Sequence, residues 1–299
     1  MQNAPICLFV YNRLWHTQQT VSSLLQNDLA KESDLFIFAD GPKNQEQAPA
    51  VKAVRDWLET VEGFKSIQMI KQETNLGLAQ SIISGVTKII NTYGKAIIIE
   101  DDLLLSPYFL SYMNQGLALY ENDSKVASIH GYTFPFKTAL PDTFFLKGAD
   151  CWGWATWKRA WDKFESDGQK LLVKLKEKKL GYEFDFDNTQ PNIQMLKDQI
   201  AGKNNSWAIR WNASAFIHDM VTLYPGMSLV RNIGFDNSGM HCVATNMYDV
   251  TISQAPVKLE RLAIVKNEQA YQVYVKYFKS LAEPLHKKLI RKTKALFVS

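Results

Sequence analysis

Three consecutive carboxylates, Glu100, Asp101 and Asp102, directly follow the apolar run Ala96–Ile99. A short run of β-branched residues like this one is typical of a strand that is buried on both faces. Like charges held together at the end of such a strand repel each other, and a cation offsets that repulsion. Hard cations such as Mg²⁺ and Mn²⁺ prefer carboxylate oxygens and take further oxygens from substrate phosphates. The triplet therefore predicts a Mn²⁺ or Mg²⁺ site. The alternative is a solvated acidic turn or the N-cap of a following helix.

The spacing also predicts how the three carboxylates face. Successive strand residues point to opposite sides, so Glu100 and Asp102 should share a side and Asp101 should face away from them. We assign Asp102 to the metal and Glu100 to a sugar or to orienting the site. Asp101 is then the residue that could contact a ribose.

Polar residues follow three more apolar runs in the first third of the chain. These runs occupy residues 6–10, 35–38 and 66–70, and helical periodicity occupies residues 17–26, 48–61 and 78–92. Alternating strands and helices with short connections predict a parallel sheet with right-handed crossovers. Ligands of such sheets bind outside the carboxyl ends of the strands. The polar residues at these ends are therefore expected to share one crevice.

Each of these polar residues at the strand ends has either a ligand-binding or a purely structural interpretation. Arg13, beside Tyr11, could neutralise a diphosphate oxygen, or could be a surface arginine. Asp40 could hold a base or a ribose through its carboxylate, or could belong to an ordinary turn. Asn75 and Gly77 could let the backbone approach a nucleotide, or could form the loop before a helix.

Tryptophans are concentrated in the second half of the chain, at positions 152, 154, 157 and 161. Aromatic faces with polar edges suit sugar rings, and Asp150 lies just before the first of these tryptophans. The alternative is core packing, because aromatic clusters dominate cores in general. Gly153, between two tryptophans, predicts a close approach of the backbone to another group.

Taken together, these residues resemble the GT-A-fold glycosyltransferases over roughly residues 4 to 245. The likeness is strongest to bacterial family 2-like sugar transferases and to the N-acetylglucosaminyltransferase I group. It rests on Pro5–Arg13, Asp40-Gly41, Asn75-Leu76-Gly77, Glu100-Asp101-Asp102 and Gly153-Trp154. The resemblance implies an α/β fold, GT-A-like (Rossmann-like), with a mostly parallel central sheet flanked by helices and an irregular second half that faces the acceptor.

The resemblance also implies residue roles. Arg13 would contact the diphosphate, Asp40 the uracil and Asp102 the metal. Asp150 and Trp154 fall in a segment similar to the one that faces donor sugar and acceptor. A later segment, residues 232–241, resembles the loop that closes over the nucleotide.

His241, at the end of that segment, would be a phosphate or metal contact. A packed or surface histidine is the alternative there.

One position departs from the family pattern. Inverting relatives carry a Trp-Asp pair whose carboxylate deprotonates the acceptor hydroxyl, and here Ala208 follows Trp207. Asp150 and Asp236 are the candidates for a substitute base, since a general base must reach the hydroxyl proton.

The bulk composition fits an ordinary globular chain of 299 residues, with 46% hydrophobic and 21% charged residues. The net charge of +4 argues against general nucleic-acid binding, and the basic excess lies after residue 275. We expect a nucleotide-sugar-binding half (1–125), an acceptor-binding half of the same domain (126–265) and a basic helical tail (266–299). The tail predicts peripheral contact with an anionic membrane or, equally, a solvated basic helix.

Cysteine spacing indicates neither a disulfide framework nor a zinc site, so we expect a cytoplasmic location. If the tail binds the membrane, the protein would lie at its inner face. The prediction is a metal-dependent transfer of a sugar from a UDP-sugar to a glycan or lipid-linked acceptor in bacterial surface polysaccharide or lipopolysaccharide synthesis. A sugar-phosphate nucleotidyltransferase and a non-catalytic carbohydrate-binding protein are the alternatives. A nucleotidyltransferase normally has a glycine-rich loop after its first strand, and the residues after the first strand here contain no glycine. A carbohydrate-binding protein needs no acidic triplet.

Overall fold

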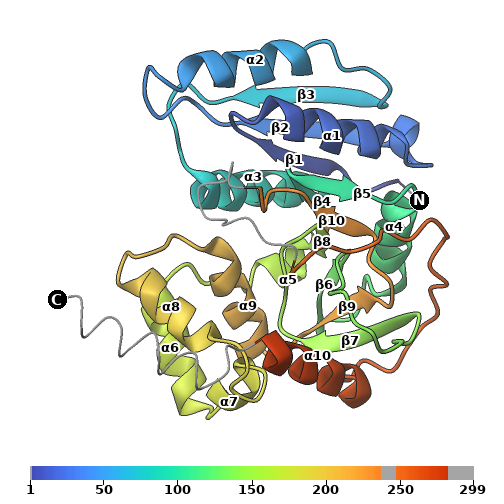
Figure 1. Ribbon diagram of the computed structural model, residues 1–299, viewed down its shortest axis with the longest axis vertical. Helices are drawn as coiled ribbons and strands as arrows, with labels where there is room; N and C mark the ends of the chain where they lie inside the picture. The colour runs from blue at the N-terminus through green and yellow to red at the C-terminus, as the bar shows by residue number, and fades with distance from the viewer. Residues whose placement is uncertain (1, 237–246, 282–299) are drawn as a thin grey trace.

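Eight strands form one central sheet in the computed structural model, which describes residues 2–236 and 247–281 (Figure 1). Their spatial order is β3-β2-β1-β4-β8-β6-β9-β7. The strands are β1 (Ile6–Val10), β2 (Asp34–Ala39), β3 (Ser66–Lys71), β4 (Lys95–Glu100), β6 (Val126–His130), β7 (Thr143–Lys147), β8 (Trp154–Trp157) and β9 (Val221–Pro225). A separate antiparallel pair joins β5 (Leu103–Leu105) to β10 (Val230–Asn232).

Helices cover both faces of this sheet (Figure 1). They are α1 (Leu14–Leu25), α2 (Ala48–Leu58), α3 (Leu78–Tyr93), α4 (Phe109–Leu119), α5 (Lys158–Trp161), α6 (Gly168–Glu177), α7 (Gly181–Phe184), α8 (Asn192–Ile200), α9 (Trp207–Ile217) and α10 (Glu268–Leu281). A 3₁₀ turn, Ala30–Glu32, precedes β2.

Alternation along the central strands explains the two layers. In β1, Ile6 and Leu8 pack in the core that contains α1, α2 and α4, whereas Cys7 and Phe9 pack in the core that contains α3, α5 and α9. Both sets are almost fully buried, as expected for a strand covered on both faces. The apolar strands predicted from the sequence are therefore central strands.

Strand directions change where β8 enters the sheet. The pairs of β1 with β2 and β4, and of β2 with β3, are parallel, but β8 runs antiparallel to both β4 and β6. In the pairing of β4 with β8, Ile98 lies opposite Trp154. The segment that leads into β8 therefore lies beside the carboxyl end of β4, where the acidic triplet is.

The α/β fold class, with its mostly parallel central sheet between helices, is confirmed. The four strands and three helices predicted in the first third are present, with ends shifted by a few residues. Strands β6, β7, β8 and β9 were not predicted, and neither were the short strands β5 and β10.

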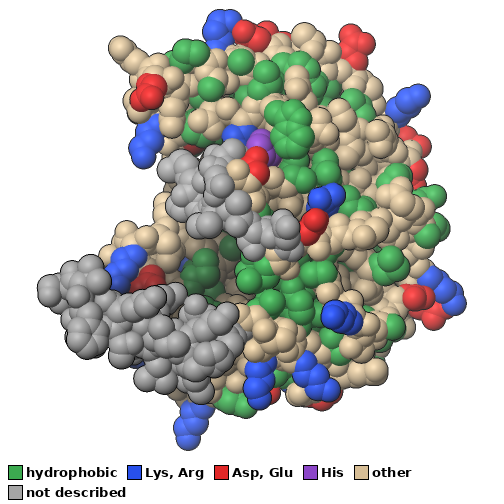
Figure 2. Space-filling view, in the orientation of Figure 1, with side chains coloured by type: hydrophobic (Ala, Val, Ile, Leu, Met, Phe, Trp, Pro, Cys, Tyr) green, Lys and Arg blue, Asp and Glu red, His purple; other side chains and the backbone are tan. Residues whose placement is uncertain are grey.

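Figure 2 shows a hollow on one face of the molecule, with hydrophobic side chains on its floor. Among the described residues, no helix is long and apolar enough to cross a membrane. Most of the basic tail, including Lys287, Lys288 and Arg291, lies outside the described residues, so the membrane contact stays a prediction.

Candidate functional site

The acidic triplet lies at the carboxyl end of β4, beside the end of β1. Glu100 is the last residue of the strand and pairs with Phe9, while Asp101 and Asp102 form a turn before β5. Thr20 of α1 holds this turn, since its hydroxyl donates to the Asp101 carbonyl (2.9 Å) and accepts from the Leu103 amide (3.1 Å).

The predicted alternation of the three carboxylates is wrong. Asp101 and Asp102 do not face opposite ways, because Arg13 contacts both carboxylates with the same nitrogen, Nη2. The physical reason is the chain geometry: the pleat of a strand alternates side chains, but here the strand ends at Glu100 and a turn follows.

Arg13 is the countercharge of this turn. It lies just before α1, and its Nη2 is 2.9 Å from Asp102 Oδ2 and also bonded to Asp101 Oδ1. Burial lowers the pKa of the guanidinium, but the two neighbouring carboxylates raise it further, so it stays charged. The sequence placed Arg13 in the same crevice but did not predict this ion pair.

Burial and the repulsion between neighbouring carboxylates disfavour the negative charge of the triplet. Burial, then Asp102 and Asp101, raise the pKa of Glu100 to about 8. Burial also raises the pKa of Asp101 to about 6, against the opposing effect of Arg13. One oxygen of Asp101, Oδ2, is buried and has no hydrogen-bond partner. A carboxylate cluster under such strain gains from an added cation.

A segment from the second half of the chain covers the turn. The Ile233 amide donates to the Asp102 carbonyl (2.8 Å), and Gly234 lies so close that a Cβ there would be 2.2 Å from Asp102 Oδ2. Two residues further, Asp236 Oδ2 is 3.1 Å from Nε2 of the buried His16. The segment predicted to cover the nucleotide therefore contacts the acidic turn through Ile233 and Gly234. His241 lies outside the described residues.

The residues present suit a divalent cation that is completed by substrate oxygens. Within residues 2–236 and 247–281, no group of three or more His, Cys, Asp or Glu side chains is arranged to bind a metal by itself. Mg²⁺, however, is usually held by only one or two carboxylates together with waters and phosphates. The hard oxygens of Asp102, with Asp101 Oδ2 unpartnered beside it, match that pattern.

Asp40 is fixed at the end of β2 by hydrogen bonds to its carboxylate. Oδ1 accepts from the amides of Gly41 (2.9 Å) and Leu76 (2.8 Å), and Oδ2 accepts from the Gly77 amide (2.9 Å) and from Asn75 Nδ2 (3.0 Å). The side chain is almost fully buried. Four donors use the acceptor capacity of one carboxylate. In this structure Asp40 holds the loop before α3 in place.

Tyr11, the remaining residue predicted at this edge, bonds through its hydroxyl to the Gln47 side chain and to the Lys43 amide (3.1 Å). It therefore supports the loop that follows β2. Tyr11, Arg13, Asp40, Asn75 and the triplet lie at the carboxyl ends of adjacent strands, or just beyond them, as the sequence predicted.

Trp154 belongs to the hydrophobic core. Its side chain is fully buried, and its ring stacks on that of Trp207 with the centroids 5.5 Å apart. Trp161 and Trp211 complete the cluster. This is the core packing that the sequence left open as the alternative to a sugar contact.

Asp150 and Cys151 lie on the other side of the acidic triplet. Burial raises the pKa of the Cys151 thiol well above its ordinary value, and Asp150, Glu100 and Asp102 add to the rise. Asp150 and Cys151 both belong to the segment that leads into β8, beside the carboxyl end of β4. Asp150 Oδ1 accepts from the Cys151 amide (2.8 Å), and Asp150 Oδ2 is 3.7 Å from Nε2 of His130.

Sequence reasoning missed several contributors to the site. Nothing in the sequence pointed to a role for Thr20, His16 or Gly234, apart from their positions within or near predicted motifs. His130 is the last residue of β6, a strand whose sequence, interrupted by Ser128, gave no clear prediction.

Comparison with known proteins gives only weak likenesses. No protein-family model and no curated protein matches the chain. Among solved structures, a mannosyltransferase from Pyrobaculum calidifontis, in complex with GDP-Man and Mn²⁺, is 14% identical over 44% of this chain and 35% of its own, with a TM-score of 0.33. TarS from S. aureus (residues 1–349) is 12% identical over 50% of this chain and 41% of its own, with a TM-score of 0.33.

A UDP-glucose pyrophosphorylase complexed with UDP-glucose is 14% identical over 75% of this chain and 91% of its own, with a TM-score of 0.34. This chain thus spans less than half the length of the first two proteins. At these identities and TM-scores the likenesses carry no argument about activity.

Proposed function

We propose that this protein is a metal-dependent glycosyltransferase that moves a sugar from a nucleotide diphosphate, in our proposal UDP, to a hydroxyl of a glycan or lipid-linked acceptor. The observation that carries the proposal is the carboxylate turn at the carboxyl end of β4, with Arg13 beside it and the Asp150–Gly153 segment on its other side. In sheets of this kind the crevice outside these strand ends is the ligand site.

Asp102, with Asp101 beside it, would hold Mn²⁺ or Mg²⁺ together with the donor's phosphates, and the metal would neutralise the leaving diphosphate. Arg13 adds a fixed positive charge at the same point, which stabilises charge that develops on the diphosphate oxygens. Glu100, the last residue of β4, would contact the donor sugar or orient the site.

In the transfer, the acceptor oxygen bonds to the anomeric carbon as the bond from that carbon to the diphosphate breaks. The hydroxyl proton then needs an acceptor within hydrogen-bond reach. Asp150 is our candidate, because its carboxylate is partly exposed and belongs to the segment that leads past the carboxyl end of β4 into β8. Asp236 is the second candidate; it lies two residues after Gly234, which contacts Asp102, and is paired with His16.

Thermal unfolding with a panel of UDP-, GDP-, dTDP- and CMP-sugars tests the donor site. A ligand at a hundred times its dissociation constant stabilises the fold by about 2.7 kcal/mol, or about 4 °C for a chain of this length. We expect such a shift with UDP-sugars only when Mn²⁺ is present. No Mn²⁺-dependent shift with any of the four nucleotides would reject the proposal.

The variant Asp102→Asn keeps the size of the side chain but removes its charge, so it should lose the Mn²⁺-dependent shift. Asp56→Asn, at an exposed position on α2, is the matched control and should behave like the wild type. An Asp102→Asn protein that binds UDP with Mn²⁺ as well as the control does would remove Asp102 from the metal site.

Product analysis separates transfer from nucleotidyl chemistry. Release of UDP on sugar transfer agrees with our proposal, whereas pyrophosphate release from UTP and a sugar 1-phosphate would identify a nucleotidyltransferase instead.

A further inference from the structure

An aromatic cavity of about 220 Å³ lies between α9, α10 and the loop before α8. We call it the aromatic cavity; its rings are those of Phe134, Phe186, Tyr224, Tyr248, Tyr274 and Phe278. Ligand sites for drug-sized molecules usually measure about 300–1,000 Å³, so this cavity has room for about one ring. It is separate from the acidic turn, none of whose residues lines it.

The inner wall of the aromatic cavity carries Asp150. Its Oδ1 is held by the Cys151 amide, and its Oδ2 is directed toward His130, whose two ring nitrogens are buried and have no hydrogen-bond partner. The His130 ring also lies edge-on to the Tyr224 ring, with the centroids 5.0 Å apart. Buried polar groups are rarely left without partners in native proteins. The nearest charged partner of the buried His130 is Asp150, so His130 can take part in the site only through that carboxylate.

Charge in the aromatic cavity favours a neutral ligand. Its lysine, Lys147, is already paired with Asp219 (3.0 Å) and Glu183 (3.5 Å). The carboxylate of Asp150 would repel a phosphate or another anion. A ligand with apolar patches and hydroxyl groups matches aromatic walls with a carboxylate at the end.

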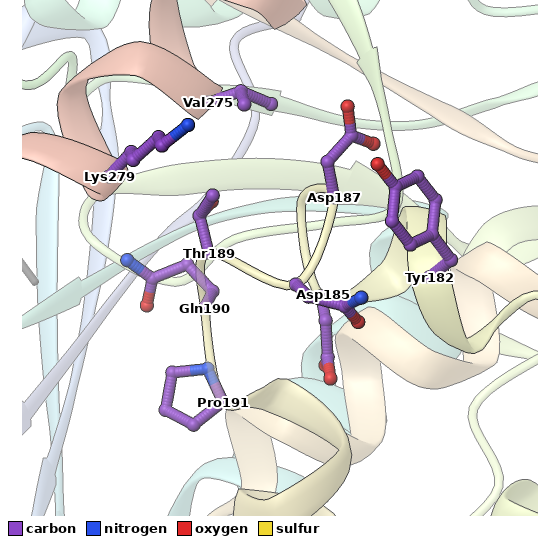
Figure 3. A pocket seen from close by; sticks show the side chains of 9 residues that line it. Tyr182, Asp185, Asp187, Thr189, Gln190, Pro191, Val275 and Lys279 are labelled. Carbon is purple, nitrogen blue, oxygen red and sulfur yellow. The ribbon is translucent and has the colours of Figure 1, made fainter. Parts of the chain in front are cut away.

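A second, open pocket of about 770 Å³ adjoins the aromatic cavity at Gln190, which lines both. Figure 3 shows Val275 and Lys279 of α10 on one side of this pocket, and Tyr182 with the loop residues Asp187 and Thr189 on the other. Three consecutive residues in this loop, Phe186, Asp187 and Asn188, have positive φ (47°, 54° and 59°), a conformation that non-glycine residues rarely adopt. Phe186 stacks on Tyr271 and Tyr274 of α10, which holds the loop in this conformation.

We propose that the aromatic cavity binds one neutral pyranose ring of the acceptor, with its reacting hydroxyl at Asp150 and the rest of the glycan continuing into the open pocket at Gln190. Its role as an acceptor site rests on the proposed function, but the binding of a sugar ring does not. The sugar contact that the sequence assigned to the tryptophans then belongs to the tyrosines and phenylalanines around α10.

In this arrangement the hydroxyl donates to Asp150 Oδ2, which receives the proton as the new glycosidic bond forms. Nε2 of His130, 3.7 Å away, can donate to the same carboxylate after a small rotation and fix its direction. His130 is thus a positioning residue for Asp150.

Saturation-transfer NMR with methyl glycosides of common hexoses, 6-deoxyhexoses and N-acetylhexosamines tests the site on the full chain, with and without UDP and Mn²⁺. We expect at least one glycoside to show transfer to its ring protons. Ala208→Phe places a ring in the aromatic cavity from α9 and should weaken that binding about tenfold or more. Ala50→Phe, at an exposed position on α2, is the control and should bind like the wild type.

Absence of glycoside binding to the wild type under both conditions would overturn the proposal, as would unchanged binding in Ala208→Phe. If Ala208→Phe does not fold, Met195→Trp fills the same cavity from an exposed position on α8. Calorimetry of UDP with Mn²⁺ on the same proteins separates the two proposals. If the wild type binds a glycoside but not UDP, only the proposed donor site is rejected. If the wild type binds UDP but no glycoside, only the present inference is rejected.

Asp150→Asn and His130→Gln distinguish a base from a merely structural carboxylate, once a glycoside that accepts sugar is known. Asp150→Asn should lower kcat about a hundredfold or more while the KM for that glycoside stays within a fewfold. His130→Gln, which can still donate to Asp150, should keep most of the activity, whereas His130→Leu should not. Equal kcat in Asp150→Asn and wild type would remove Asp150 from the reaction.

Discussion

Replacing Asp40 by asparagine should destabilise the protein even when no nucleotide is bound. Each Asp40 oxygen accepts two hydrogen bonds, so an amide nitrogen at either position would face two donors. Hydrogen bonds to a charged group contribute about 1.5–3 kcal/mol each, and two of them are lost. Allowing for relaxation of the loop, we expect a loss of about 3 kcal/mol in the free energy of unfolding.

For a chain of 299 residues, that loss corresponds to a fall in Tm of about 5 °C. Differential scanning calorimetry on the nucleotide-free protein measures it directly. Asp56→Asn is the control, because its exposed ion pair with Lys52 contributes little and its Tm should change by less than about 1 °C.

Two outcomes separate loop fixation from base recognition. If Asp40 mainly holds the loop, Asp40→Asn lowers the Tm without ligand, and Asn75→Ala, which removes one of the same hydrogen bonds, lowers it less. If Asp40 instead contacts the uracil and does little for the loop, the Tm of the nucleotide-free variant stays at the wild-type value and only the affinity for UDP falls. The second outcome would refute our reasoning from the four hydrogen bonds.

Two further predictions concern the acidic turn. The pKa of Glu100 is raised from 4.5 to about 8, so the folded state holds this proton more tightly, and the resulting stability is lost as pH rises from about 5 to 8. Without metal, Tm should fall by up to about 2 °C per pH unit over this range, and Glu100→Gln should flatten the slope; equal slopes would contradict the assignment. Gly234→Ala should force Asp102 to move and weaken Mn²⁺-dependent UDP binding, measured by calorimetry. Gly181→Ala, where a Cβ meets nothing closer than 3.9 Å, is its control, and equal affinity in the two variants would contradict the predicted crowding.

The sequence predicted the first four strands, β1 to β4, because three of them, β1, β2 and β4, are continuous apolar runs. Strands such as β1 and β4 are buried on both faces, which produces this pattern. Strands β6 and β9 escaped prediction because Ser128 and Thr222 interrupt their apolar runs; the two hydroxyls bond to each other inside the sheet (2.7 Å). A polar pair of this kind is visible only once the strands are neighbours.

The strand-end positions of the polar residues were predicted, but their bonding was not. The apolar runs alone predicted that Arg13, Asp40 and Asp102 follow neighbouring strands at one edge of the sheet. Which partner each side chain takes depends on turns and on segments far away in the chain. Asp101 and Asp102 both contact Arg13 because β4 ends at Glu100, so the alternation of strand side chains does not extend to these two residues. The Asp40 carboxylate accepts hydrogen bonds mainly from backbone amides because the loop of residues 75–77 lies against it.

One short segment, Asp150–Gly153, connects the acidic turn to the aromatic cavity, and the sheet topology is the reason. Strand β8 lies antiparallel between β4 and β6, so the residues that lead into it must pass the carboxyl end of β4. Gly153 holds that passage fixed: its φ is +66°, its carbonyl accepts from the Gly131 amide (2.7 Å), and a Cβ there would meet Val230 at 2.8 Å. A segment held this tightly keeps Asp150 at a constant distance from the acidic turn, where we propose that the diphosphate binds. The sugar transfer that we propose needs that constancy, because orientation of the reacting groups supplies much of the rate enhancement.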